Sequence, residues 1–251
     1  MRCRARFPPG VCPNSDGRLL HCAGGEPFRL AATCMRILSV NTGEIELLPE
    51  GKSKTKTGIY KYPRKGSVHV GETHLEGDHI ANKKHHGGPD QAVYLYSAED
   101  YAWWEKELDS ELPFGTFGEN LTVASFDGRQ PRVGDIWHFE QVVLQMTAPR
   151  IPCSKLAARM EDPAFLKRFV QVNRGGAYAR VLHTGPVAAG EQGRLEPAPE
   201  GAPYIDEIFA LWHSSPKDVE LMRRALQHPL AERARTVLEM WLSKESATRN
   251  S

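Results

Sequence analysis

Hydrophobic residues fall in short runs over most of the chain and recur at helical spacing after about residue 203. The short runs are alternating or continuous and end at glycine-rich turns, which is typical of β-strands. Strands are expected at residues 37–40, 57–60, 68–70, 92–96, 121–123, 136–139, 142–146 and 178–182, and near Ala188 and Arg194. Many short strands with few helices predict a mainly β (α+β) fold, either a β-barrel or a mixed β domain.

Two helices are expected within this β-rich part. Ser97 and Asp100 have the spacing of a capping box, with aspartate in place of the usual glutamate or glutamine. The large apolar residues that follow share one helix face and are expected in the core: Tyr101, Trp104 and Leu108. Asp162 and Pro163 provide an N-cap and an N1 proline, which predicts a helix from about residue 163 to 171.

A proline-rich linker at residues 196–203 precedes a helical C-terminal part. One amphipathic helix is expected at residues 205–212, a second opening at Ser215-Pro216 with Asp218, and a third starting at Pro229. The pattern predicts a β domain at residues 35–198 and a three-helix C-terminal domain at residues 203–246. Three short helices are also compatible with a DNA-binding module. Residues 203–251, however, hold seven Lys+Arg and seven Asp+Glu, so the segment has no net positive charge and direct nucleic-acid binding is disfavoured.

The composition of the chain is that of a globular protein and gives no sign of a membrane-spanning or polyanion-binding protein. The chain has 251 residues, 40% of them hydrophobic, with a net charge of +1, and these values are ordinary for a soluble globular protein. The small net charge gives no reason to expect a polyanion partner. No apolar run approaches the roughly 20 residues of a membrane-spanning helix, so no membrane association is expected.

Four of the five cysteines lie within residues 1–34, and Cys153 is alone in the rest of the chain. Residues 35–251 therefore cannot form a disulfide among themselves, which is typical of proteins in a reducing cytoplasm. Residues 1–34 lack hydrophobic periodicity and are expected to be an unstructured extension or to precede the natural start at Met35. A transit peptide is disfavoured by Asp16 and Glu26, and a zinc knuckle by the lack of a Cys-x-x-Cys pair.

Four polar blocks sit at the ends of expected strands, at residues 75–91, 115–120, 149–155 and 173–176. They are rich in Gly, His, Asp, Lys and Arg, and each alone is compatible with a solvated tight turn. Glycine lets a ligand approach the backbone closely, and exposed amides with nearby Lys or Arg bind anions. Because barrel mouths often hold ligands, the four blocks together predict a site for an anionic cofactor or substrate.

Cys153 lies in the most distinctive of these blocks. Pro149 and Pro152 restrict the backbone on its N-terminal side, and Arg150 and Lys155 place two positive charges near the thiol. Neighbouring cations favour the thiolate, which is the form that attacks electrophiles or ligates metals. The alternative is a small buried hydrophobe, as most free cysteines are.

Four motifs, in order, give the chain a resemblance to a known family. They are Leu75-Glu-Gly-Asp78, Lys84-x-His86-Gly-Gly-Pro-Asp90, Phe117-Gly-Glu-Asn-Leu121 and Pro149-Arg-x-Pro-Cys-x-Lys-Leu156. From about Met35 to Trp241 the sequence resembles MOSC-domain proteins of the kind that adds a three-helix C-terminal domain. The resemblance implies a β-barrel-like fold that holds the molybdenum cofactor (molybdenum bound to molybdopterin), with Cys153 as the sulfur ligand of the metal.

The same resemblance implies roles for other residues. The proposed cofactor-binding set is Lys84, His86, Gly87, Gly88, Asp90, Gly118, Glu119, Asn120, Arg150, Lys155 and Arg174. Arg174 belongs to this set on its chemistry alone, because its block is not one of the four motifs. His86 or Asp78 is the expected proton donor, and Asp78 and Asp90 have a second interpretation as carboxylates that orient basic residues.

The activity implied is reduction of N-hydroxylated compounds, including hydroxylaminopurine-type base analogues, with electrons from a separate flavin-dependent protein. Cys153 is then a catalytic residue and metal ligand. Two alternatives remain open: a sulfur carrier in which Cys153 bears a persulfide, and a non-enzymatic module that binds or delivers the cofactor.

Overall fold

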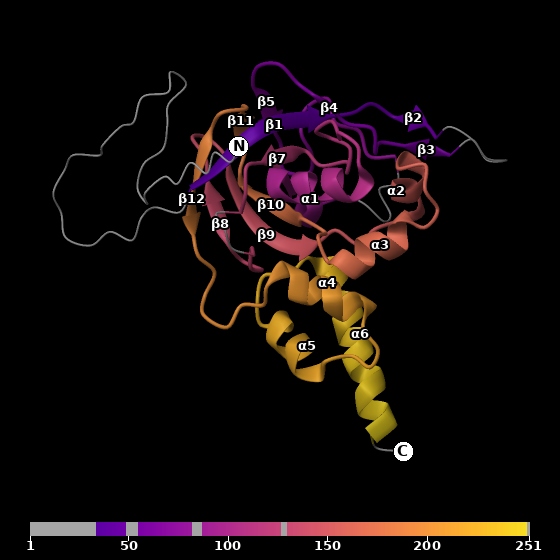
Figure 1. Cartoon of the computed structure of the whole chain (residues 1–251). Coiled ribbons are helices and arrows are strands. Elements are labelled where there is room, and N and C mark those ends of the chain that lie inside the picture. Colours follow the sequence, from indigo (N-terminus) through magenta and orange to yellow (C-terminus); the bar gives the residue numbers. More distant parts are fainter. Residues whose placement is uncertain (1–33, 49–54, 82–86, 127–129, 250–251) are drawn as a thin grey trace, which may run out of the picture. The chain divides into compact units, whose positions relative to one another are not determined.

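Seven strands close into a β-barrel in the computed structural model, which describes residues 34–48, 55–81, 87–126 and 130–249. The barrel strands are β1 (Cys34–Thr42), β6 (Val93–Ser97), β7 (Leu121–Val123), β8 (Ile136–His138), β9 (Val143–Pro149), β10 (Ala177–His183) and β12 (Gln192–Glu196). Their order is β12-β8-β9-β10-β6-β7-β1, and pairing of β12 with β1 closes the ring (Figure 1). Neighbouring strands are antiparallel except β6 and β7, which are parallel. The predicted mainly β, barrel-like fold with three C-terminal helices is confirmed.

Shorter elements decorate the barrel. The strand β4 (Tyr62–Pro63) extends the sheet beside β1. Two small ribbons pair β5 (Val68–Val70) with β11 (Gly185–Val187), and β2 (Glu46–Leu47) with β3 (Lys56–Thr57). A 3-10 turn, η1 (Pro89–Gln91), leads into β6.

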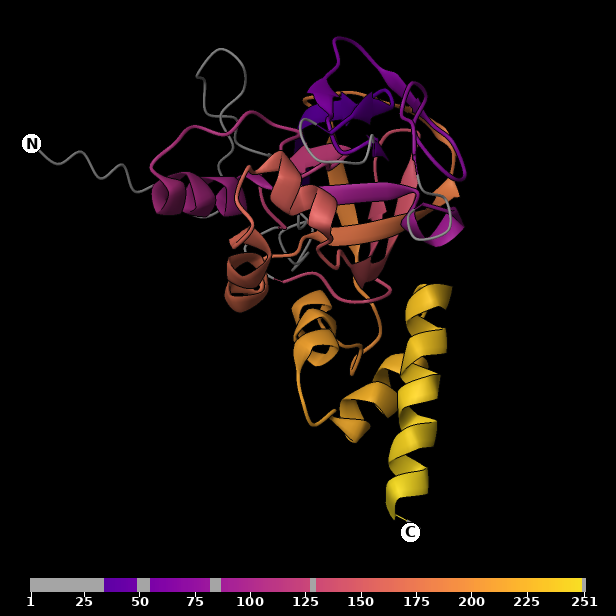
Figure 2. The same cartoon turned by 90° about the vertical axis from the view of Figure 1, so that its right-hand side faces the viewer.

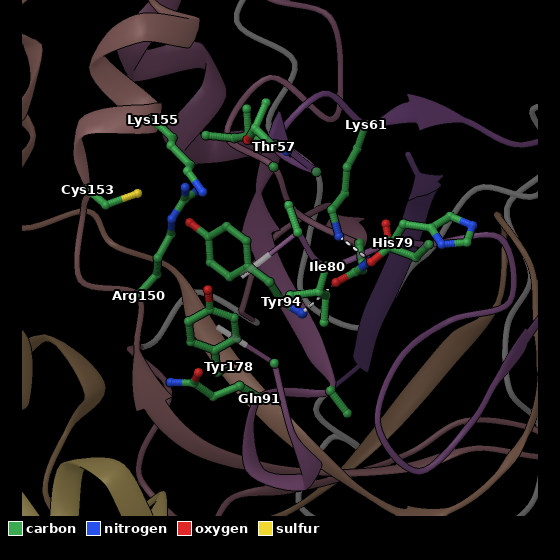
Figure 3. Close-up of a pocket in the computed structure, with 18 residues that line it drawn as sticks. Thr57, Lys61, His79, Ile80, Gln91, Tyr94, Arg150, Cys153, Lys155 and Tyr178 are labelled. Carbon is green, nitrogen blue, oxygen red and sulfur yellow. Dashed lines mark hydrogen bonds and ion pairs between the residues drawn. The ribbon is translucent and has the colours of Figure 1, made fainter. Parts of the chain in front are cut away.

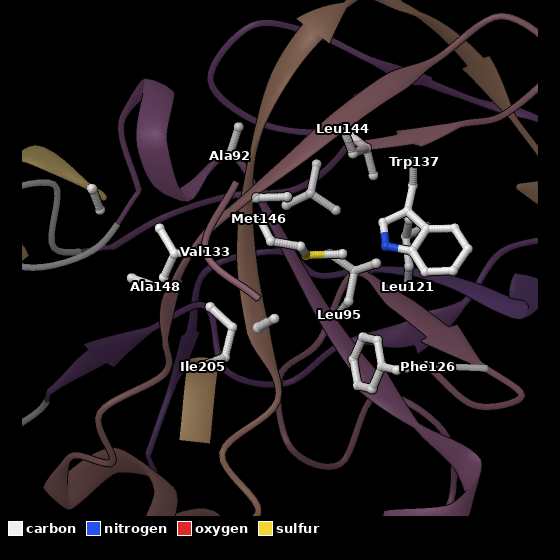
Figure 4. Close-up of a cluster of buried hydrophobic side chains, with 14 of the residues drawn as sticks. Ala92, Leu95, Leu121, Phe126, Val133, Trp137, Leu144, Met146, Ala148 and Ile205 are labelled. Carbon is white, nitrogen blue, oxygen red and sulfur yellow. The ribbon is translucent and has the colours of Figure 1, made fainter. Parts of the chain in front are cut away.

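Side chains fill the inside of the barrel, as expected for a barrel of about this strand number. Leu95 of β6, Leu121 of β7, and Leu144 and Met146 of β9 are each 0% exposed and pack together (Figure 4). Trp137 is buried in the same cluster. The interior is therefore a packed core, and any ligand site must lie at the barrel's end or outside it.

A second core, rich in aromatic rings, involves α1 (Ala98–Leu108) and α3 (Phe165–Val172). Trp104 is 0% exposed, stacks on Phe169 at a ring-centroid distance of 5.9 Å, and donates from its indole nitrogen to the Tyr96 hydroxyl at 2.9 Å. Tyr101 is buried in the same cluster, so the prediction that these aromatics are core is confirmed. Ser97 caps α1 by accepting from the Asp100 amide at 3.0 Å, as its spacing predicts.

Three helices follow the barrel: α4 (Ile205–His213), α5 (Val219–Leu226) and α6 (Glu232–Arg249). They gather near one end of the barrel (Figures 1 and 2), where α4 contacts β9. Ile208 and Leu211 of α4 and Leu238 of α6 belong to the same buried cluster as the barrel interior. The hydrophobic core is thus continuous from the barrel into these helices.

Two helices begin later than expected, because a side chain near each expected start accepts a hydrogen bond from a backbone amide. Asp218, not Ser215, caps α5 by accepting from the Leu221 amide at 2.9 Å. The Asp162 carboxylate accepts from the Ala164 amide at 2.8 Å and stabilises a turn, so α3 begins at Phe165 instead of Pro163.

The helix α2 (Ser154–Arg159) is not among the helices expected from the sequence. The expectations for residues 1–33 lie outside the described residues, whereas Cys34 is the first residue of β1. Among the residues that the structure describes, no helix is long and apolar enough to cross a membrane.

Candidate functional site

A pocket lies where the loops and strands around β3, β6, β9 and β10 converge (Figure 3). Its empty space, including the part that is open to solvent, is about 650 Å³. Its lining residues are Thr57, Gly58, Ile59, Lys61, Asp78, His79, Ile80, Ala81, Gly87, Gln91, Ala92, Tyr94, Gly118, Asn120, Arg150, Cys153, Lys155 and Tyr178. Segments far apart in the sequence therefore build one site.

One side of the pocket, here called the thiol side, consists of Cys153, Arg150 and Lys155 (Figure 3). The strand β9 ends at Pro149 and α2 starts at Ser154, so all three residues lie on the short connection or in the first turn of the helix. Cys153 has extended backbone angles at the N-cap of α2 and is half-buried.

Arg150 is anchored under the pocket by two contacts. Its guanidinium donates to the Phe117 carbonyl and lies 5.1 Å from the centre of the Tyr94 ring, while only 6% of the residue is exposed. Burial alone would lower the pKa of Arg150, but attraction to Tyr94, Tyr178 and Cys153 outweighs burial and raises it. Arg150 is therefore a fixed, permanently charged cation whose field stabilises negative charge on the Cys153 sulfur.

The opposite side, where Lys61 lies in Figure 3, is here called the carboxylate side because Lys61 pairs there with Asp78. One Asp78 oxygen accepts from the Gly43 amide at 3.1 Å, and the other accepts from Lys61 Nζ at 2.6 Å and Asn120 Nδ2 at 2.9 Å. Asn120 is oriented in turn, because its side-chain oxygen accepts from the Tyr94 amide at 3.1 Å. Burial lowers the pKa of Lys61, and Asp78 opposes that effect. The carboxylate side is thus a buried ion pair with its hydrogen bonds largely satisfied.

Positive backbone φ angles favour glycine at positions 118 and 87. Gly118 has φ +74°, and a Cβ there would lie 3.1 Å from Ile59 Cγ1 and 3.7 Å from Arg150 Nη1. At Gly87, with φ +72°, a Cβ would approach Ile80 Cδ1 to 2.3 Å. These turns bring backbone close to other lining residues and so shape the pocket wall.

Seven of the residues predicted from sequence line this pocket: Asp78, Gly87, Gly118, Asn120, Arg150, Cys153 and Lys155. Gly88, with φ +90°, has open space on its Cβ side but does not line it. Lys84 and His86 lie outside the described residues, so their predicted roles stay predictions.

Glu119 lies beneath the pocket wall and is 0% exposed. Its Oε1 accepts from the Tyr101 hydroxyl at 2.6 Å, the Gly115 amide at 2.7 Å and the Thr122 hydroxyl at 2.7 Å. Burial raises the pKa of Glu119, although these hydrogen bonds oppose the rise. In this position the carboxyl group organises the 115–120 turn and does not face the pocket.

Arg174 and Asp90 are also directed elsewhere. Arg174 donates to the Asp100 carboxylate at 2.6 Å and stacks over Trp103, so it faces α1. Asp90 pairs with Arg180 at 2.9 Å and accepts from the Glu232 amide at 2.8 Å, which ties η1 to the start of α6. The structure does not bring either side chain to the pocket.

Sequence reasoning missed six lining residues with polar side chains: Thr57, Lys61, His79, Gln91, Tyr94 and Tyr178. Tyr94 and Tyr178 lie in apolar strand segments, where an aromatic residue is normally interpreted as core. Their hydroxyl groups were the available signal, since a buried phenol needs a partner. Tyr94 finds one in the Gly175 carbonyl at 2.9 Å. Lys61 follows an expected strand, and its partner Asp78 is 17 residues away in the sequence, so nothing local indicated that the two would pair.

The fold and the pocket together define a class: a closed β-barrel protein with a pocket in which a cysteine lies beside an arginine and a lysine. Residues 82–193 match the model of the MOSC domain family. The chain is 38% identical to YflK of Bacillus subtilis over 174 residues, covering 69% of this chain and 78% of that protein. It is 32% identical to YiiM of Escherichia coli over 155 residues, covering 61% and 68%. The chain belongs to the MOSC domain family and is homologous to YiiM.

Two further relatives add information on fold and class. The crystal structure of YiiM from Geobacillus stearothermophilus superposes with a TM-score of 0.68 at 27% identity, covering 83% of this chain and 99% of that one. A protein named "Reductase" from Gibberella moniliformis is 34% identical over 159 residues, which are 62% of this chain but 28% of the fungal protein. MOSC domains generally bind the molybdenum cofactor.

Proposed function

We propose that this protein is a molybdenum-cofactor-dependent reductase of N-hydroxylated compounds, including hydroxylaminopurine-type base analogues, that receives electrons from a separate flavin-dependent protein. The observation that carries the proposal is the thiol side of the pocket: Cys153 lines the cavity next to the buried cation Arg150. Membership of the MOSC family and the fungal relative named a reductase support it.

The donor set of the pocket fits this cofactor. A cysteine thiolate is a soft ligand suited to a metal that also carries sulfur ligands. The phosphate of a pterin cofactor needs fixed positive charge, and Arg150 and Lys155 supply it on the same side as Cys153. When bound, the cofactor supplies two-electron redox chemistry and accepts the oxygen of the N–OH group.

The chain's own residues would bind, orient and shield. Cys153 would ligate the metal, and Arg150 and Lys155 would hold the anionic end of the cofactor. Asp78 orients Lys61, because both of its oxygens already accept hydrogen bonds. This arrangement favours the orienting role of Asp78 over proton supply, and leaves His86 as the proposed proton donor.

Replacing the thiol tests the proposal most directly. In full-length protein made in a cofactor-competent host, Cys153→Ser is expected to lower molybdenum content and to reduce turnover of an N-hydroxylated substrate at least about 100-fold, because the metal loses its protein ligand. Elemental analysis and a reduction assay with a chemical electron donor measure the two effects. Cys34→Ser, at the exposed start of β1, is the matched control. Full activity of Cys153→Ser with unchanged molybdenum would refute the assignment.

The same thiol also suits a sulfur carrier, since Arg150 would stabilise a persulfide anion on Cys153 as it does a thiolate. Intact mass measurement distinguishes the two: a persulfide adduct without molybdenum favours the carrier. Tight cofactor binding without turnover of N-hydroxylated substrates would instead favour a binding or delivery module.

A further inference from the structure

A second cavity lies between the end of β9 and the C-terminal helices, and we call it the helix-side chamber. Its empty space, including the part that is open to solvent, is about 1050 Å³. Its lining residues are Gln91, Ala148, Pro149, Ile151, Tyr178, Ile208, Trp212, Arg233, Ala234, Thr236 and Val237. Gln91 and Tyr178 also line the pocket that contains Cys153. These two side chains therefore form a wall that is common to both cavities.

The walls of the helix-side chamber are mainly apolar. Ile151 comes from the connection that carries Cys153, Trp212 from α4, and Val237 from α6. Trp212 is half-buried, and its ring packs edge-on against Trp241 at a centroid distance of 5.1 Å. An indole held in this way on a cavity wall offers a rigid surface for a flat ligand.

The polar side chains of the chamber are few, and Arg233 lies beside Gln91, which lines both cavities. Arg233 donates to the Gln91 side-chain oxygen at 3.2 Å, and its charge reaches Tyr178, where it opposes the increase in pKa that burial causes. Arg233 and Thr236 are exposed at the opening. A few polar groups on an otherwise apolar cavity are typical of small-molecule sites, where they orient the ligand.

We propose that the helix-side chamber binds the planar aromatic body of the substrate, while its N–OH group extends past Tyr178 and Gln91 toward Cys153. The inference rests on the proposed function and deepens it, because it makes α4 and α6 part of the substrate site. Trp212 and Arg233 then determine specificity for aromatic substrates. A small aliphatic hydroxylamine can reach Cys153 without filling the chamber.

Binding of adenine, a planar base without an N–OH group, tests the inference independently of turnover. Thr236→Trp fills the chamber from an exposed position, and Trp212→Ala removes an apolar wall. Isothermal titration calorimetry on the full chain is expected to show a Kd for adenine at least about tenfold higher in both variants. Met240→Ala and Arg223→Gln change exposed residues of α6 and α5 that do not line the chamber, and should leave the Kd unchanged. Thr236→Trp keeps the test decisive if Trp212→Ala fails to fold.

Steady-state kinetics provide a second test of the helix-side chamber. Thr236→Trp is expected to lower kcat/KM for N-hydroxylated adenine about tenfold, mainly through KM, and to leave kcat/KM for N-methylhydroxylamine unchanged. Equal losses for both substrates, or adenine binding that ignores Thr236→Trp, would overturn the inference while the proposed function stands. Adenine binding that depends on the chamber in a protein without reductase activity would support the chamber and defeat the proposed function instead.

Discussion

The two sides of the Cys153 pocket use charge in opposite ways. On the carboxylate side, Lys61 is paired with Asp78 at 2.6 Å and both are buried. On the thiol side, no carboxylate among the described residues forms an ion pair with Arg150 or Lys155. Arg150 is held instead by the Phe117 carbonyl and the Tyr94 ring.

This difference separates structure from binding. A buried ion pair that is already compensated has little attraction left for a ligand, whereas a fixed cation without a carboxylate partner can attract an anion. We therefore expect changes on the carboxylate side to affect mainly the free energy of unfolding. Changes on the thiol side should affect mainly retention of the cofactor.

The largest expected effect is the loss of Asp78. Asp78→Ala leaves Lys61 buried without its partner, and breaking such a pair typically costs about 3–5 kcal/mol in the free energy of unfolding. Chemical denaturation monitored by circular dichroism measures the loss.

The matched control removes both charges. Lys61→Met combined with Asp78→Asn should recover most of the lost stability, because no buried charge then remains unpaired. If Asp78→Ala unfolded within about 0.5 kcal/mol of the wild type, as an ordinary surface substitution does, the carboxylate side would not be the structural half of the pocket.

The next effect concerns Arg150. Arg150→Gln should weaken retention of the cofactor by about 1.5–3 kcal/mol, the range for hydrogen bonds to a charged group. Its effect on the free energy of unfolding should be smaller than that of Asp78→Ala. Molybdenum content after dialysis, measured alongside a denaturation curve, separates the two quantities.

Arg159→Gln is the matched control for Arg150, because Arg159 also lies over a tyrosine ring, at 4.9 Å from the centre of Tyr60, but does not line the pocket. Equal loss of molybdenum in both variants would show that any nearby cation serves, and the contrast between the two sides would weaken.

Short apolar runs predicted the barrel strands because strand formation here depends on local alternation and burial. The Cys153 connection was also predictable, since its charges and prolines are adjacent in sequence. The pairing of Lys61 with Asp78 was not, because it depends on how two loops meet across the pocket. Helix α2 was missed because it is short and follows a proline-rich stretch that is typical of a loop.

Arg174 shows why a strand-end position does not identify a site residue. Ala177 pairs with Pro149, so the chain around Arg150 and Arg174 lies at the same end of the barrel. Arg150 turns inward under the pocket, but Arg174 turns outward to Asp100 on α1. The sequence predicts that both arginines lie at a strand end. The direction of each side chain, however, depends on partners that only the folded chain brings near.

The smallest expected effect tests the buried carboxyl group beneath the carboxylate side. Burial raises the pKa of Glu119, so the folded protein binds this proton more tightly than the unfolded chain does. The contribution of the Glu119 carboxyl group to stability is therefore complete below the unfolded value near 4.5 and is lost as pH rises through the folded pKa.

Glu119→Gln mimics the protonated form of this side chain, so its stability should not show this loss with rising pH. The difference between the two proteins should therefore increase as the pH rises. Denaturation midpoints from pH 4 to pH 8 measure it, with Glu220→Gln on the exposed face of α5 as control. A constant difference across that range would mean that Glu119 binds protons equally in both states, and the carboxylate side would then contain a single buried ion pair with no titrating neighbour.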